Sequence, residues 1–176
     1  MSLDKIKEHI PEYAKDLKLN LSTVSRCETL SQKQTYGCMY ACALVSQHPG
    51  MAKMVLEDSG NVLEDADVTG AKSAASIMSM NNIYYRFAHM IGDDEIEKMP
   101  AKLRMNVIGK PGCDKTDFEC WSLAVSVINN CQKCIQAHYS QLQNAGFTKQ
   151  QIQDIARISS TVRAVAEVLK WESVSL

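Results

Sequence analysis

Residues 148–171, TKQQIQDIARISSTVRAVAEVLKW, decide the fold class of this chain. Thr148 and Gln151 have the spacing of a capping box, in which the hydroxyl accepts a hydrogen bond from a backbone amide and the glutamine side chain reaches back to the cap. Apolar residues then recur at intervals of three and seven positions, and these are Ile152, Ile155, Val162 and Leu169. The stretch therefore predicts a long helix with one apolar face.

Helix signals also dominate the rest of the chain. Ser31 and Gln34 repeat the capping-box spacing, and Asp114 stands where an N-cap would open a helix. Period-two alternation is scarce, Asn-Gly and Asp-Gly hairpin turns are missing, and no glycine- and serine-rich linker divides the sequence. We therefore expect an all-α chain that forms one domain over residues 1–176, with room for a break in the fifth helix. The expected helices cover residues 2–9, 11–18, 31–47, 50–59, 64–90, 101–108, 114–129, 131–145 and 148–171.

Composition limits the classes of partner. The 19 Lys and Arg residues nearly cancel the 20 Asp and Glu residues, so no charge excess favours a nucleic acid or a membrane surface. Apolar runs stop well short of the ~20 residues that a bilayer requires. The first residues, MSLDKIKEHIPEY, are too charged for the apolar segment of a signal peptide. We therefore expect a cytoplasmic protein.

The chain has seven cysteines, an odd number that does not suit a secreted disulfide scaffold. Five of them are expected to be small buried hydrophobic residues, and these are Cys27, Cys38, Cys42, Cys113 and Cys120. Cys38 and Cys42 are one helical turn apart and could meet, although a pair of core thiols is the favoured interpretation.

The other two cysteines belong to NNCQKCIQAHY, residues 129–139. On a helix, Cys131, Cys134 and His138 fall within roughly 60° of one another, so they would share one face. We expect Asn129-Asn130 to cap this helix and Cys131 to lie in its first turn, where free amides and the helix dipole favour a thiolate, Cys131 more than Cys134. Lys133 would add a positive charge near both sulfurs.

Two further side chains could move protons at such a site. His138 has a reference pKa of ~6.5, which suits proton transfer near neutrality. Glu119, a dozen residues upstream, lies on the preceding predicted helix and could act as a base once that helix folds back. Alone, Glu119 is as readily a solvated surface residue and His138 a structural histidine, but their combination with Cys-x-x-Cys favours thiol redox chemistry.

A weak internal repeat is visible at an offset of 85 residues. It aligns TYGCMYACALVS (35–46) with CWSLAVSVINNC (120–131). Identities are few, so chance and duplication account for it equally well. With duplication, the fold would have two pseudo-repeated halves, and the first would carry Ser46 and Pro49 in place of the two motif cysteines.

The whole chain resembles a known family. The segments that carry the likeness are IPEYAKDLKLNL (10–21), MNNIYYR (80–86) and LRMNVIGKPGCDKTDFECWSLAVSVINNCQKCIQAH (103–138). They are similar to alkyl hydroperoxidase D (AhpD), a family of the carboxymuconolactone decarboxylase-like superfamily. The combination of a glutamate, Cys-x-x-Cys and a histidine four residues later is specific to it.

The resemblance implies an all-helical homotrimer, with its catalytic helices at about 114–145. It implies an antioxidant that reduces organic hydroperoxides and regenerates the oxidised peroxiredoxin AhpC. Electrons would come from the lipoyl group of a dihydrolipoamide acyltransferase, and no cofactor or metal would be bound. Cys134 would be oxidised by peroxide, the more exposed Cys131 would close a redox disulfide and meet the reductant, and Glu119 with His138 would form the proton relay. Lys133 departs from the family, which has a histidine there, and we leave it out of the relay.

Three alternatives stay open. Cys131, Cys134 and His138 could bind a structural zinc ion, although such sites usually require four ligands. The fourth would have to come from Cys38 and Cys42 or from Cys113 and Cys120. The protein could instead act only as a redox adaptor between partner proteins, or be a lyase of the same superfamily, in which many members lack the cysteine pair.

Overall fold

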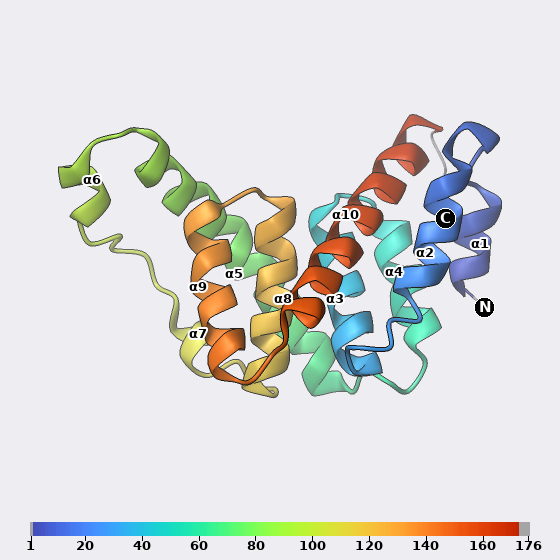
Figure 1. Ribbon diagram of the computed structural model, residues 1–176, viewed down its shortest axis with the longest axis horizontal. Helices are drawn as coiled ribbons and strands as arrows, with labels where there is room; N and C mark the ends of the chain where they lie inside the picture. Colours follow the sequence, from blue (N-terminus) through green and yellow to red (C-terminus); the bar gives the residue numbers. More distant parts are fainter. Residues whose placement is uncertain (1, 173–176) are drawn as a thin grey trace.

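Helices α3 (Gln32–Val45) and α8 (Lys115–Ile128) pack against each other at the centre of the computed structural model, which describes residues 2–172 (Figure 1). Both are buried along most of their length because apolar and small residues occupy nearly every position. The surrounding helices are α1 (Ser2–Glu8), α2 (Lys15–Val24), α4 (Pro49–Ser59), α5 (Asp65–Met90), α6 (Asp94–Lys98), α7 (Asn106–Gly109), α9 (Gln132–Asn144) and α10 (Lys149–Trp171), with a 3-10 turn at Glu12–Ala14.

The all-α prediction is confirmed, since residues 2–172 contain helices and no strand. The capping boxes at Ser31 and Thr148 are formed as expected, and α5 runs unbroken. Residue 1 and residues 173–176, the ends of the predicted domain, lie outside the described residues. None of the described helices combines the length and the apolar character needed to cross a membrane.

Two helix predictions were wrong in extent, and one short helix was missed. The helix expected at 11–18 is a 3-10 turn followed by α2, which continues to Val24 because Leu21 and Val24 are buried at its end. Helix α6 was missed because its five residues are exposed or half-buried and carry no apolar periodicity. The helix expected at 101–108 is reduced to α7, since Lys102 has a positive φ of 51°, which interrupts helical geometry.

The helix order supports an internal duplication with a corrected offset. Helices α3 and α8 begin at residues 32 and 115, and α4 and α9 begin at 49 and 132, a difference of 83 in both cases. Helices α5 and α10 begin at 65 and 149. At an offset of 83, the N-cap of α9, Cys131, corresponds to His48, the N-cap of α4, rather than to Ser46.

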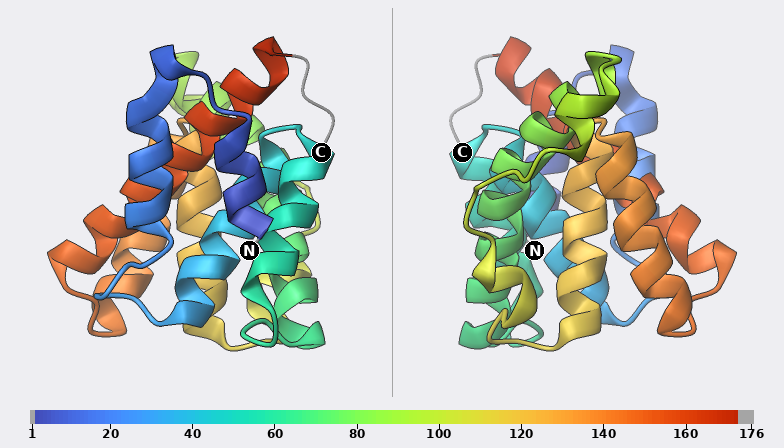
Figure 2. Two further views of the ribbon diagram at one scale, coloured as in Figure 1. Left: turned by 90° about the vertical axis from the view of Figure 1, so that its right-hand side faces the viewer. Right: turned by 90° about the vertical axis from the view of Figure 1, so that its left-hand side faces the viewer.

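The two ends of the molecule differ. Helices α1, α2 and α4 lie at one end, while α9 and the segment from the end of α5 through α6 to α7 lie at the other (Figures 1 and 2). Helix α6 projects beyond α9 (Figure 1). The cysteine motif is therefore at the end that carries this projecting segment.

The core depends on close packing around Trp121. Its indole is fully buried against Gly37 of α3 and Gly70 of α5, and a Cβ atom at either glycine would overlap the ring or Cys113. Gly37→Ala is expected to destabilise the protein by about 1–3 kcal/mol, since overpacking forces a fully buried ring to move. Thermal unfolding measures the loss, and Gly109→Ala, at an open position, is the control. Equal unfolding temperatures for wild type and Gly37→Ala would contradict this packing.

Buried thiols make the stability of the folded protein depend on pH in the alkaline range. Cys38 and Cys42 are fully buried, and burial raises the pKa of the Cys42 thiol to about 12. In the unfolded chain the Cys42 thiol ionises near pH 9. The contribution of the buried neutral thiol to the free energy of unfolding is therefore complete below about pH 9 and is lost as the pH rises toward 12. At pH 10 the loss is about 1.5 kcal/mol for Cys42. Urea unfolding at pH 7.5 and pH 10 should show a smaller decrease for Cys42→Ala than for wild type; the same decrease in both proteins would argue against the effect.

Candidate functional site

A disulfide joins Cys131 and Cys134, whose Cα atoms are 5.3 Å apart. Cys131 is itself the N-cap of α9, and its sulfur accepts a hydrogen bond from the backbone N–H of Cys134 at 3.3 Å. The expected cap at Asn129-Asn130 was therefore wrong. Asn129 instead ends α8, and Asn130 makes the turn with a positive φ of 52°, a conformation that asparagine tolerates better than most residues.

The two sulfurs differ in access, in the opposite sense to the expectation. Cys131 is 0% exposed, whereas Cys134 keeps 7% of its surface exposed. Cys131 is enclosed because it sits at the turn between α8 and α9, beneath α5. Cys134 lines a cavity of about 550 Å³, and Cys131 does not. The other residues that line this cavity are Met78, Asn81, Tyr85, Met105, Ile108, Lys115, Glu119, Lys133, Ala137, His138, Ser140 and Gln141.

Glu119 and His138 meet as predicted. Both are buried, and His138 Nδ1 lies 2.6 Å from Glu119 Oε2. Lys115, one helical turn before Glu119, places its Nζ 2.8 Å from the other carboxylate oxygen. Burial acts to raise the pKa of Glu119, but the hydrogen bonds from His138 and Lys115 outweigh it and lower the pKa below its usual value. The carboxylate is thus held ionised between two donors.

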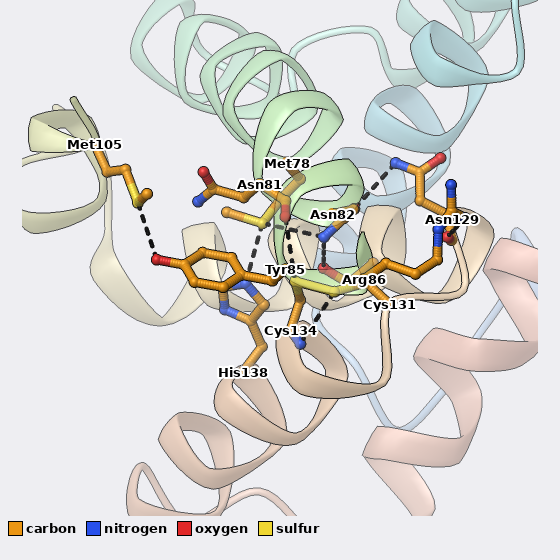
Figure 3. Close-up of a disulfide and its surroundings, with 11 residues drawn as sticks. Met78, Asn81, Asn82, Tyr85, Arg86, Met105, Asn129, Cys131, Cys134 and His138 are labelled. Carbon is orange, nitrogen blue, oxygen red and sulfur yellow. Dashed lines mark hydrogen bonds between the residues drawn. A yellow bond between two sulfur atoms is a disulfide. The ribbon is translucent and has the colours of Figure 1, made fainter. Parts of the chain in front are cut away.

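The other ring nitrogen of His138 points toward α5. Nε2 lies 3.2 Å from the sulfur of Met78, a fully enclosed side chain (Figure 3). Cys134 Sγ is 3.9 Å from the backbone oxygen of Asn81 on the same helix. His138 and Cys134 therefore face the same turn of α5, and both line the cavity.

Helix α5 also braces the turn that carries the cysteines. The Asn82 side-chain amide donates to Ser126 Oγ at 3.0 Å and accepts from Asn129 Nδ2 at 3.0 Å. Arg86 Nη1 donates to the backbone oxygen of Asn129 at 2.7 Å (Figure 3). These bonds fix the end of α8 relative to α5, two residues before Cys131.

Lys133 forms an ion pair that the sequence did not indicate. Its ammonium lies 2.7 Å from Glu97 of α6, and His89 Nδ1 is 3.6 Å from the same Glu97 oxygen. The hydrogen bond from Lys133 lowers the pKa of Glu97. The lysine charge is therefore largely matched by a carboxylate, and the ion pair ties the projecting segment to α9.

The remaining cysteines lie apart from the motif. Cys38, Cys42 and Cys120 are free thiols buried in the core, as expected, and Cys38 and Cys42 do not form a disulfide. Cys27 and Cys113 are only half-buried, which corrects the expectation for those two. Within residues 2–172, no three His, Cys, Asp or Glu side chains group as metal ligands would, so the zinc alternative has no ligand set there.

Sequence reasoning missed several residues of this site. Lys115 could have been found, since a lysine four residues before Glu119 faces it on a helix. Asn82 and Arg86 lie in MNNIYYR, but nothing local predicts that their partners are more than 40 residues away. A larger depression of about 930 Å³ between α2 and α10 contains none of the predicted site residues.

Comparison with known proteins identifies the family of the chain. The model of the carboxymuconolactone decarboxylase family matches residues 94–171. The alkyl hydroperoxide reductase AhpD of Brucella anthropi is 47% identical over 170 residues, which cover 97% of each chain. The AhpD proteins of Gluconacetobacter diazotrophicus (47% identical; 96% of this chain and 93% of the relative) and Maricaulis maris (46%; 98% and 100%) are similar over the same length. The chain therefore belongs to the AhpD family of alkyl hydroperoxide reductases.

Proposed function

We propose that this protein is a thiol-dependent peroxidase that reduces alkyl hydroperoxides through the Cys131–Cys134 pair. The observation that carries the proposal is a disulfide at the wall of a cavity that Glu119 and His138 also line. In the first step the Cys134 thiolate attacks the terminal oxygen of ROOH, the O–O bond breaks, and the alkoxide takes a proton to leave as ROH. Cys131 then attacks the sulfenic acid and releases water, which forms the disulfide.

Cys134 is assigned to the peroxide because of access. It is the cysteine of the pair that lines the cavity, and a hydroperoxide with an apolar chain would contact the aliphatic wall formed by Met78, Met105 and Ile108. Glu119 and His138 are assigned to the proton relay. His138 would take the thiol proton of Cys134 and return it to the leaving oxygen, while ionised Glu119 orients the ring.

The reductant is proposed to be the dihydrolipoyl group of a dihydrolipoamide acyltransferase. Its thiolate would attack the accessible sulfur, Cys134, and Cys131 would leave. Departure of Cys131 is favoured because its sulfur is stabilised at the N-terminus of α9 by the Cys134 amide. The second lipoyl thiol then releases the enzyme, so that two electrons and two protons move from the dithiol to the disulfide.

This order of attack replaces the role that the family resemblance implied for Cys131, and it gives a direct prediction. Oxidised protein treated with a monothiol such as cysteamine should carry the mixed disulfide on Cys134, with Cys131 free. Peptide mass spectrometry after acid quenching identifies the modified sulfur. An adduct predominantly on Cys131 would show that the enclosed sulfur becomes accessible and would reverse the assignment.

The oxidised peroxiredoxin AhpC is proposed as a second protein substrate.

The protein is proposed to be a cytoplasmic homotrimer. Exposed apolar side chains along one face of α5 support self-association near the site, and these are Ile83, Phe87 and Met90. Light scattering coupled to size exclusion would give three times the 19.6 kDa chain mass. A monomer would contradict the trimer without affecting the redox proposal.

The decisive experiment is reduction of cumene hydroperoxide with dihydrolipoamide as the electron donor. We expect turnover by the protein alone and faster consumption when the peroxiredoxin is added. Turnover seen only with the peroxiredoxin would favour the adaptor function. No consumption in either mixture, with intact thiols, would contradict the proposed function.

A further inference from the structure

The MNNIYYR segment, residues 80–86, presents two faces toward the redox helix. Asn82 and Arg86 hold the turn between α8 and α9, as described above. Asn81 and Tyr85, four residues apart and therefore one helical turn apart, line the cavity with Cys134. The second pair has no part in bracing the turn, so its polar groups require another explanation.

Asn81 is a buried amide with an unsatisfied oxygen. The residue is 4% exposed, and its Oδ1 has no hydrogen-bond partner. The other buried side-chain atoms without a partner among residues 2–172 are Thr35 Oγ1, Trp121 Nε1 and Ser122 Oγ, none of which lines this cavity. Because a buried carbonyl without a donor costs free energy, an unpaired one that lines a cavity suggests that a ligand supplies the donor.

The Tyr85 hydroxyl also lacks a strong hydrogen-bond partner. Its hydroxyl lies 3.8 Å from the sulfur of Met105, and a thioether is a poor acceptor. His138 Nε2 likewise faces a thioether, that of Met78. Three polar groups around the cavity thus lack an oxygen or nitrogen partner, while the sulfurs and Ile108 supply its apolar surface. The Asn81 amide and the Tyr85 ring lie on the same side of the disulfide, toward Met105 (Figure 3).

We propose that Asn81 and Tyr85 bind the oxygen atoms of the hydroperoxide on its approach to Cys134. The inference rests on the proposed function and deepens it. A hydroperoxide offers one O–H donor and two acceptor oxygens. The Asn81 carboxamide can accept the O–H through Oδ1, and the Tyr85 hydroxyl can donate to the oxygen that leaves as the alcohol. The pair would lower the cost of bringing a polar peroxide group into an otherwise apolar cavity.

The test separates peroxide binding from thiol reactivity. Asn81→Leu removes the hydrogen-bonding amide at similar volume. Tyr85→Phe removes only a hydroxyl from a half-buried ring, so we expect it to fold even if Asn81→Leu does not. Asn144→Leu, at an exposed position on α9, is the control. Stopped-flow measurements give the second-order rate constant for oxidation of each reduced protein by cumene hydroperoxide.

We expect this constant to fall roughly tenfold for Asn81→Leu and about threefold for Tyr85→Phe, the loss of one hydrogen bond in each case. Alkylation of reduced Cys134 by iodoacetamide and reduction of the disulfide by dithiothreitol, which involve no peroxide, should stay within about twofold of wild type. Equal losses in alkylation and peroxide oxidation would indicate a purely structural role and overturn the inference.

Two failures are distinguishable. If wild type reacts with hydroperoxide and both variants react as fast, the binding role of Asn81 and Tyr85 is wrong and the proposed function stands. If reduced wild-type protein reacts no faster than a free thiol, the proposed function is wrong and the inference falls with it.

Discussion

Replacement of Cys134 by serine is expected to abolish hydroperoxide reduction. A hydroxyl cannot be oxidised to the sulfenic acid, and serine at 134 leaves Cys131 enclosed and without a partner for a disulfide. Turnover with cumene hydroperoxide and dihydrolipoamide should fall to the rate of the uncatalysed mixture. The measurement is peroxide consumption, followed for wild type and variant at equal protein concentration.

The matched variant is Cys131→Ser, in which the peroxide step is retained but the disulfide cannot form. A sulfenic acid should then accumulate at Cys134 and react with dimedone, one adduct per chain. Cys27→Ser, at a half-buried free thiol outside the cavity, should keep full activity. Substantial turnover by Cys134→Ser, or a dimedone adduct first on Cys131 in wild type, would reverse the two roles.

Loss of the proton relay is expected to have the second largest effect. Glu119→Gln and His138→Phe each remove one partner of the 2.6 Å hydrogen bond, so Cys134 would lose its proton to solvent instead. General acid–base catalysis contributes on the order of a hundredfold or more, and losses of that size are expected in the peroxide step at neutral pH. The pH–rate profile should also move to higher pH, because thiolate formation then depends on hydroxide rather than on the relay.

The relay prediction has an internal control in the neighbouring charges. Lys133→Ala should reduce the rate less than tenfold, since its ammonium is paired with Glu97 and its influence on the sulfurs is through charge alone. If both relay variants keep the wild-type pH profile, Glu119 and His138 serve only the structure of the site.

Periodic patterns made the fold predictable. Capping boxes at Ser31 and Thr148 and apolar periodicity gave the central and terminal helices, because each pattern reports on a helix that buries one face. Helix α6 has no such buried face. Lys102 adopts a positive φ, which cannot be predicted from a lysine in the sequence. The secondary structure of segments without a pattern of buried residues is therefore difficult to predict from a single sequence.

The site was predictable to the extent that one helix contains it. Helical spacing placed Cys131, Cys134 and His138 together, and Glu119 was indicated by its position on the preceding helix and by the family resemblance. The enclosure of Cys131 and the cavity wall formed by Asn81 and Tyr85 depend on α5, which approaches from about 50 residues upstream. Contacts between distant elements arise from packing, and no local spacing reports them.

A helix capped by sulfur also bears on how the oxidised and reduced proteins differ. The Cys134 amide donates to Cys131 Sγ in the disulfide form, and a free Cys131 thiolate would be a stronger acceptor for that amide. Asn82 and Arg86 anchor the loop through groups that take no part in electron transfer. If these anchors hold in both redox forms, a partner that discriminates between the forms has to recognise the chemical state of the sulfurs rather than a movement of the backbone.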